Sequence, residues 1–113
     1  MSDDGVVSAL SGPLVPFGHM TSEHADESPG LYSFWVRGTC LYVGMSMNLR
    51  QRLRQHCESE DNEQLRECFE AYNTEIKFAV MYHYGITEQR LRKLESSAIK
   101  AMHPLANRQG VAA

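Results

Sequence analysis

The sequence lacks the features that mark membrane and secreted proteins. Its 113 residues contain no apolar run near the 18 residues that a membrane-spanning helix needs, and the mean hydropathy is −0.40. The first 29 residues contain no Lys or Arg, so neither a secretory signal nor an Arg-rich transit peptide is expected there. We therefore expect a cytoplasmic protein that does not associate with membranes.

Cysteine is scarce, and its spacing fits neither a zinc site nor a disulfide framework. Cys40, Cys57 and Cys68 are an odd number of thiols, with no CxxC pair among them. We interpret them as free thiols that pack in the interior of a protein in a reducing compartment.

A net positive charge is also missing, since 11 basic residues stand against 14 acidic ones. Taken over the whole chain, this balance argues against a nucleic-acid partner, which usually requires a basic surface. The charges are nevertheless segregated along the chain. Residues 1–29 hold five acids and no base, 30–57 four Arg and no acid, 58–75 seven acids and one Arg, and 76–113 six bases and two acids. The two basic segments can therefore face phosphate groups.

The chain divides into a tail and one folded domain. Residues 1–29 are rich in Gly, Pro and acidic residues, a composition that buries little apolar surface, so we predict a mobile N-terminal tail. Three apolar residues could still anchor this tail on the domain: Leu14, Val15 and Phe17. The predicted domain covers residues 30–108, and residues 109–113 form a short C-terminal tail.

Hydrophobic periodicity predicts an α+β fold, in the wider sense an α/β protein. Strands are indicated over 31–36, 40–43 and 75–84, and helices after Asn48, over 62–72 and after Thr87 up to Pro104. The predicted element order is β, β, α, α, β, α, with a small sheet covered by about three helices.

The register of the predicted hairpin decides whether two tyrosines can act together. A turn centred on Arg37 sets Tyr32 opposite Tyr42, so that both phenols share one face of the sheet. A turn centred between Arg37 and Gly38 sets Tyr32 opposite Val43 and places the tyrosines on different faces. The sequence permits either arrangement.

Several polar residues have both an ordinary and a functional interpretation. Arg52 and His56 lie four residues apart and share a helix face, which on its own is typical of a solvated surface. Glu95 lies at the border of an apolar helix stripe, where a carboxylate needs a partner or a metal ion. An ion pair with Arg92 would satisfy it without any function. Asn107, taken alone, is typical of a turn.

The joint order of these residues is more specific than any one of them. GLY at 30–32 precedes YVG at 42–44 by ten residues, and S-x-N-L-x-x-R-L-x-x-H follows at 46–56, with Glu95 and Asn107 further on. In this order and spacing the sequence resembles the GIY-YIG nuclease family, from residue 30 to about residue 108.

The resemblance implies a three-stranded antiparallel sheet with flanking helices and a phosphodiester hydrolase that uses one Mg²⁺ or Mn²⁺ ion. It also implies the catalytic residues, which are Tyr32, Tyr42, Arg52, His56 and Glu95, with Glu95 as the metal ligand. His56 matches a histidine that only some members carry. Asn107 matches the family's late asparagine, and we place Arg50 and Arg54 with it as substrate-binding or structural residues.

The expected substrate is DNA, and 113 residues leave no room for a separate DNA-reading domain. Specificity must then come from loops, dimerisation or a protein partner, or from recognition of branched or damaged DNA. Two alternatives remain open. A non-catalytic nucleic-acid binding module could share this fold, and the acidic segment 58–75 could be the contact surface of an interaction domain.

Overall fold

The computed structural model describes residues 4–18 and 25–107. The elements in chain order are α1 (Asp4–Leu10), β1 (Val15–Pro16), β2 (Gly30–Val36), β3 (Thr39–Ser46), α2 (Leu49–Glu58), α3 (Glu63–Tyr72), the 3₁₀ turn η2 (Asn73–Glu75), β4 (Lys77–Tyr82), α4 (Glu88–Met102) and the 3₁₀ turn η3 (Leu105–Asn107). Within these residues, no helix is long and apolar enough to cross a membrane.

The sheet is antiparallel and has four strands in the order β1-β4-β2-β3, so the prediction of three strands was wrong by one. The added strand, β1, pairs Val15 with Phe78 and Pro16 with Lys77. Two residues are too few to leave a period of two in a sequence, and proline is tolerated at a sheet edge because the outer N–H is not needed there. β3 forms the opposite edge.

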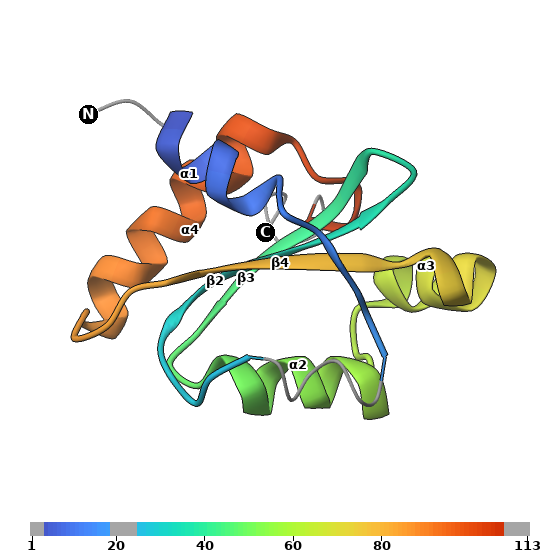
Figure 1. Cartoon of the computed structure of the whole chain (residues 1–113), viewed down its shortest axis with the longest axis horizontal. Helices are drawn as coiled ribbons and strands as arrows, with labels where there is room; N and C mark the ends of the chain where they lie inside the picture. Colours follow the sequence, from blue (N-terminus) through green and yellow to red (C-terminus); the bar gives the residue numbers. More distant parts are fainter. Residues whose placement is uncertain (1–3, 19–24, 108–113) are drawn as a thin grey trace.

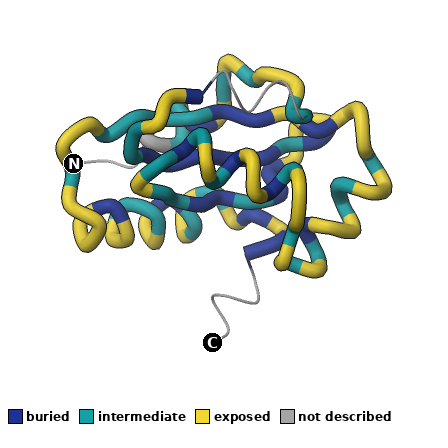
Figure 2. Tube along the Cα trace, turned by 90° about the horizontal axis from the view of Figure 1, so that it is seen from below, coloured by how far each residue is buried: buried dark blue, intermediate teal, exposed yellow. Residues whose placement is uncertain are grey.

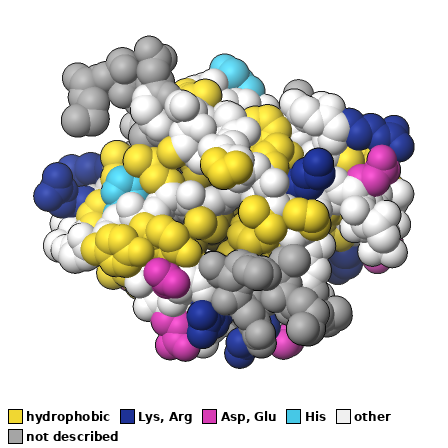
Figure 3. All heavy atoms as spheres, in the orientation of Figure 1, with side chains coloured by type: hydrophobic (Ala, Val, Ile, Leu, Met, Phe, Trp, Pro, Cys, Tyr) yellow, Lys and Arg dark blue, Asp and Glu magenta, His cyan; other side chains and the backbone are white. Residues whose placement is uncertain are grey.

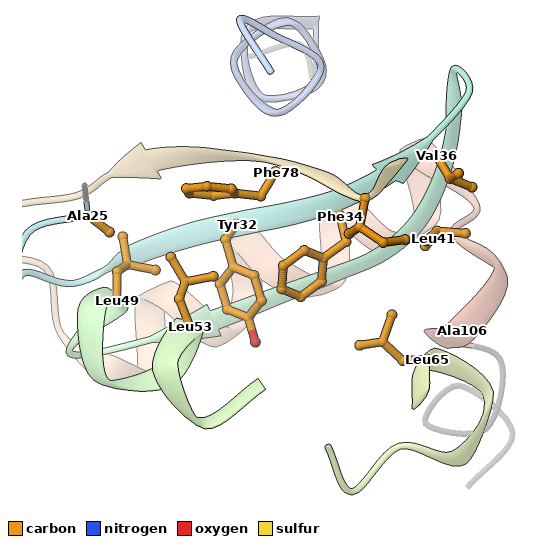
Figure 4. Close-up of a cluster of buried hydrophobic side chains, with 11 residues drawn as sticks. Ala25, Tyr32, Phe34, Val36, Leu41, Leu49, Leu53, Leu65, Phe78 and Ala106 are labelled. Carbon is orange, nitrogen blue, oxygen red and sulfur yellow. The ribbon is translucent and has the colours of Figure 1, made fainter. Parts of the chain in front are cut away.

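Helices cover both faces of this sheet (Figure 1). α1 and α4 lie on one face, where Leu31, Leu91 and Ala98 are buried. α2 and α3 lie on the other face, where Tyr32 and Phe34 project from β2 towards the leucines of α2 (Figure 4). The central strands carry most of the buried positions, while exposed positions lie on the outer turns of the helices (Figure 2).

The N-terminal segment carries α1 and β1 and packs on the domain where the structure describes it, and its predicted mobility stays a prediction. The Leu10 side chain is fully buried, and its carbonyl accepts hydrogen bonds from Ser33 Oγ at 2.5 Å and Trp35 Nε1 at 2.9 Å. Phe17 packs on Phe34 with ring centroids 4.7 Å apart. The few apolar residues of the segment therefore meet buried partners in the domain, which composition alone does not reveal. The predicted tail at 109–113 lies outside the described residues.

Asparagine and threonine caps begin the main helices as expected. Asn48 Oδ1 accepts from the N–H of Gln51, and Thr87 Oγ1 accepts from the N–H of Arg90 at 3.3 Å. α4 ends at His103, whose φ of +48° closes the helix before Pro104. These local signals place α2 and α4, and hence Arg52 and Glu95, against the sheet.

The β2–β3 hairpin contains a bulge. Its turn is the residue pair Arg37 and Gly38, with φ of +48° and +79°, which matches the twist of the flanking strands. Trp35 pairs with Cys40, but the next pair is Phe34 with Tyr42. Leu41 is therefore the extra residue on β3.

The bulge settles the register that the sequence left open. Beyond it, Tyr32 lies opposite Gly44, which is neither of the two partners considered above. Because Tyr42 is two residues from Gly44, Tyr32 and Tyr42 share one face of the sheet, with ring centroids 6.1 Å apart. Without the extra residue, the same turn would set Tyr32 opposite Val43 and separate the tyrosines.

Candidate active site

Three residues form a buried chain of hydrogen bonds beneath the hairpin. The Tyr32 hydroxyl lies 2.6 Å from Nε2 of His56, and the His56 Nδ1 bonds to a carboxylate oxygen of Glu60. Tyr32 is fully buried, and the side chains of His56 and Glu60 are 1% and 6% exposed. A strand, a helix and the loop after that helix therefore meet in one polar cluster inside the core.

Glycine at position 44 makes room for this cluster. A Cβ on Gly44 would overlap the Tyr32 hydroxyl and would lie 2.5 Å from Cζ of Tyr32 and 2.8 Å from Cε2 of Tyr42. Those distances are too short for any carbon contact, so a side chain at this position would displace the phenols. The glycine of the YVG motif is thus required by close approach.

Tyr42 and Arg52 lie above the buried chain and are both partly exposed. The Tyr42 ring lies 5.6 Å from the His56 ring. The positive charge of Arg52 lowers the pKa of five surrounding groups. They are Tyr32, Tyr42, His56, Glu60 and Glu95. Arg52 is therefore the central cation of the site.

The free edge of β3 brings Glu95 and Asn107 to the same place. The side chain of Asn107 binds the backbone of Val43 twice, accepting from its N–H at 2.8 Å and donating to its carbonyl at 2.9 Å. Two residues along the same edge, the N–H of Met45 is near enough to the Glu95 carboxylate to lower its pKa. Because β3 has no strand beyond it, its outward N–H groups are open to these side chains.

Burial and charge act in opposite directions in this cluster. Burial raises the pKa of Tyr32 well above its usual value, with a further increase from Tyr42, while Arg52 opposes the rise. Burial lowers the pKa of His56 below its usual value, although the bond to Glu60 works against this. At neutral pH the imidazole is therefore neutral, and Nε2 can accept a proton.

The surroundings of Glu95 raise the pKa of its carboxyl group. Burial raises its pKa, and Arg92, the Met45 N–H and Arg52 partly oppose the rise. The guanidinium of Arg92 bonds instead to Glu88, with an N–O distance of 2.7 Å. Arg92 therefore acts on Glu95 through its charge, while its hydrogen-bonded ion pair is with Glu88.

A family model described as the UvrC-like GIY-YIG domain matches residues 28–108 of this chain. The match covers well over half of the sequence. The chain belongs to the UvrC-like GIY-YIG family. No curated protein matches the chain.

Solved GIY-YIG domains share the fold. The N-terminal endonuclease domain of UvrC from Thermotoga maritima, bound to its catalytic magnesium ion, is 24% identical, with a TM-score of 0.62 over 78% of this chain and 92% of that chain. Two point mutants of that domain, each bound to its catalytic divalent cation, also have TM-scores of 0.62. A Tyr-to-Phe mutant is 24% identical over 78% of this chain and 91% of that chain, and an Asn-to-Ala mutant is 23% identical over 77% and 90%.

In this GIY-YIG domain the three arginines of α2, which are Arg50, Arg52 and Arg54, have different surroundings. The Arg50 side chain binds the carbonyl of Ala25 at 2.8 Å and pairs with Glu27 at 3.6 Å. Arg50 and Arg54 line a shallow hollow of about 250 Å³ together with Glu27. The helix turn thus places both of them away from Arg52, and their expected role towards substrate stays a prediction.

The residues near Glu95 suit a hard cation that carries water ligands. Among the described residues, no three His, Cys, Asp or Glu side chains gather as a metal cluster. A half-buried carboxylate that feels the charge of Arg52 fits Mg²⁺, which keeps several waters and takes few protein ligands. It does not fit a structural zinc site.

Sequence reasoning missed Glu60. This residue lies four positions after His56, just beyond the end of α2, within a run of acidic residues that hides it. The i, i+4 spacing from a histidine at a helix end was the signal that could have found it.

Proposed function

We propose that this GIY-YIG domain is a metal-dependent endonuclease that hydrolyses phosphodiester bonds in DNA. The observation that carries the proposal is the 2.6 Å hydrogen bond between Tyr32 and His56, in a cluster where the charge of Arg52 also acts on Glu95. A module that only bound nucleic acid would have no use for a buried proton acceptor behind a tyrosine.

Arg52 and Tyr42 form the part of the site that substrate meets first. Both side chains are partly exposed, whereas Tyr32 and His56 are buried. The planar guanidinium of Arg52 neutralises charge on the phosphate, and the Tyr42 hydroxyl orients the attacking water. Loss of the guanidinium should lower kcat by about 100-fold or more.

Tyr32 and His56 take the proton of the attacking water. A protonated phenol can accept that proton only if it gives up its own at the same time. His56 Nε2 lies 2.6 Å from the Tyr32 oxygen and receives this proton, which leaves an imidazolium beside the Glu60 carboxylate. This relay requires access of water to the Tyr32 oxygen, which is buried in the structure.

Glu95 would hold the divalent ion, Mg²⁺ or Mn²⁺. When bound, the ion supplies positive charge to the phosphate oxygens and to the departing 3′ oxygen. The Met45 N–H would stabilise the ionised carboxylate, and Asn107 binds the same strand at Val43.

Nicking of supercoiled plasmid in the presence of Mg²⁺ tests this function. Glu95→Gln should abolish nicking, because an amide is a much weaker ligand for Mg²⁺ than a carboxylate. Glu88→Gln is the matched control, since Glu88 lies on the same helix and bonds only Arg92 at an exposed position. Full activity of Glu95→Gln would contradict the assignment of the metal ligand.

Branched, nicked and linear duplexes should be compared in the same assay. The loops of this domain, a second copy, a protein partner or the shape of the DNA can each supply specificity. Preference for a branched or damaged duplex supports recognition of DNA structure. Tight binding of all substrates without cleavage in several divalent metals would favour the binding module instead.

A further inference from the structure

Glu60 has a place in the site that the family's known motifs do not give it. One of its carboxylate oxygens bonds Nδ1 of His56, and the other accepts the backbone N–H of Asn62 at 2.8 Å. Its side chain is 6% exposed. Burial of a carboxylate costs desolvation free energy, and here hydrogen bonds to both oxygens offset that cost.

We propose that Glu60 is the positioning residue that fixes the tautomer and orientation of His56. The inference rests on the proposed function, because His56 is assigned there as the final proton acceptor. Glu60 does not touch substrate and acts only through the imidazole.

The chemistry of the three groups sets the direction of each hydrogen bond. A neutral imidazole has one N–H donor and one acceptor nitrogen, whereas an ionised carboxylate only accepts. Glu60 therefore takes the Nδ1–H of His56, which leaves Nε2 as the acceptor. The Tyr32 hydroxyl must then donate to Nε2, which is the direction that proton transfer to His56 requires.

Glu60 is itself held by a rigid part of the fold. Asn62 begins α3, where its Oδ1 accepts from the N–H of Leu65 at 3.1 Å, and its Nδ2 donates to the carbonyl of Ala106 at 2.8 Å. Ala106 precedes Asn107, which binds β3 at Val43. The loop that orients His56 and the turn that clamps the hairpin are therefore fastened together.

The charged and titratable groups around His56 come from four elements. Tyr32 faces it from β2, Tyr42 from β3 and Arg52 from α2, while Glu60 and Asp61 face it from the loop before α3. Of these, only Glu60 bonds to Nδ1. Glu60 also lines an open groove of about 440 Å³ with Glu58 and Arg66, so the loop that carries Glu60 lies at the surface of the domain.

Two substitutions separate the two effects of Glu60. Glu60→Gln keeps a side-chain oxygen that can accept the Nδ1–H but removes the negative charge. Glu60→Leu removes the acceptor as well. Glu58→Gln is the matched control. Glu58 lines the same groove and is exposed, and its substitution removes an equal charge.

The decisive measurement is the ¹⁵N NMR signal of the imidazole nitrogens in the metal-free, DNA-free domain. His56 is assigned by comparison with His56→Gln. In the wild type and in Glu58→Gln, Nδ1 should carry the proton and Nε2 should resonate as an acceptor. Glu60→Leu should show a mixture of tautomers or the opposite one. An unchanged tautomer in a folded Glu60→Leu variant would overturn the proposal.

Kinetics give a second readout that a merely structural residue would not produce. Glu60→Leu should lower kcat for plasmid nicking by about tenfold or more and leave KM near the wild-type value. In Glu60→Gln the acidic limb of the pH–rate profile should move to lower pH, because the carboxylate that raises the pKa of His56 is gone. An unshifted limb contradicts the role of the charge.

The two experiments distinguish failure of this inference from failure of the proposed function. The NMR result does not depend on nuclease activity, so a tautomer controlled by Glu60 in an inactive domain would refute only the function. An active nuclease whose His56 tautomer ignores Glu60 would refute only the positioning role. Thermal unfolding of each variant shows whether the fold is retained.

Discussion

At the scale of single residues, the site depends on the close packing of its polar side chains, for which Gly44 leaves space. Order and spacing predicted Tyr32, Arg52 and Glu95 as site residues, and the charge of Arg52 lowers the pKa of both other groups against the effect of burial. Gly44 was recognised only as part of a motif, and its reason, space for the Tyr32 hydroxyl, appears only in three dimensions. Residue order cannot report such a distance.

Replacing Gly44 by Ala should destabilise the domain by about 1–3 kcal/mol, because the new methyl group overlaps both phenols. Urea unfolding measures this effect, and plasmid nicking should fall in parallel. The control is Gly5→Ala in α1, where a Cβ meets no atom within 4 Å and alanine favours the helix. Equal unfolding free energies of the two variants would contradict the close approach at Gly44.

The buried, neutral His56 should make stability depend on pH. Its pKa in the folded state is below the usual 6.5, so the unfolded chain binds more protons as pH falls. Stability from this residue is fully present above pH 6.5 and is lost as pH falls through the folded pKa. The wild type should therefore lose unfolding free energy between pH 7.5 and 5.5, and His56→Gln should lose less.

The comparison is made by urea unfolding at each pH, with exposed His103 replaced by Asn as the control. Identical slopes in the wild type and His56→Gln would show that the imidazole is not held neutral.

At the scale of elements, the hairpin was predictable and its exact pairing was not. Alternation of apolar residues indicates both strands, and the Arg37–Gly38 turn is readable. The extra residue, Leu41, is not, because a bulge changes which residues pair without changing their composition. The strand β1 was missed for a similar reason, since two residues carry no period.

Asn107 should control the stability of the β3 edge. Asn107→Ala removes two hydrogen bonds to the Val43 backbone, so we expect a loss of about 1–3 kcal/mol and faster exchange of the Val43 amide. Hydrogen exchange followed by NMR measures this, with the Ala79 amide of β4 as the internal reference. If both amides accelerate equally, the effect is a global loss of stability and not a local release of the strand.

At the scale of the whole molecule, charge is arranged by segment. The basic segments contain Arg52 and α4, and the acidic segment 58–75 contains α3. On the face shown in Figure 3, hydrophobic side chains form a band across the middle, and charged side chains lie mainly around its rim. A chain with a net charge of −3 can therefore still offer phosphate a local basic surface.

Bound DNA should leave the outer face of α3 accessible. Its acidic side chains repel phosphate, so hydrogen exchange and proteolysis within residues 58–75 should not change when duplex is added, whereas α2 should be protected. Glu60 and Asn62, which are tied to the site, are excluded from this comparison. Protection of α3 by DNA would contradict the prediction.

The short strand β1 has a consequence for how the domain behaves in solution. The family match begins at residue 28, yet α1 and β1 precede it and cover Leu31 and the outer edge of β4. A chain trimmed to residues 28–108 would expose the unpaired backbone edge of β4 and the apolar surface around Leu31. Such a fragment should self-associate more than the full chain at the same concentration, which light scattering measures. The packed unit therefore extends beyond the region that the family model matches.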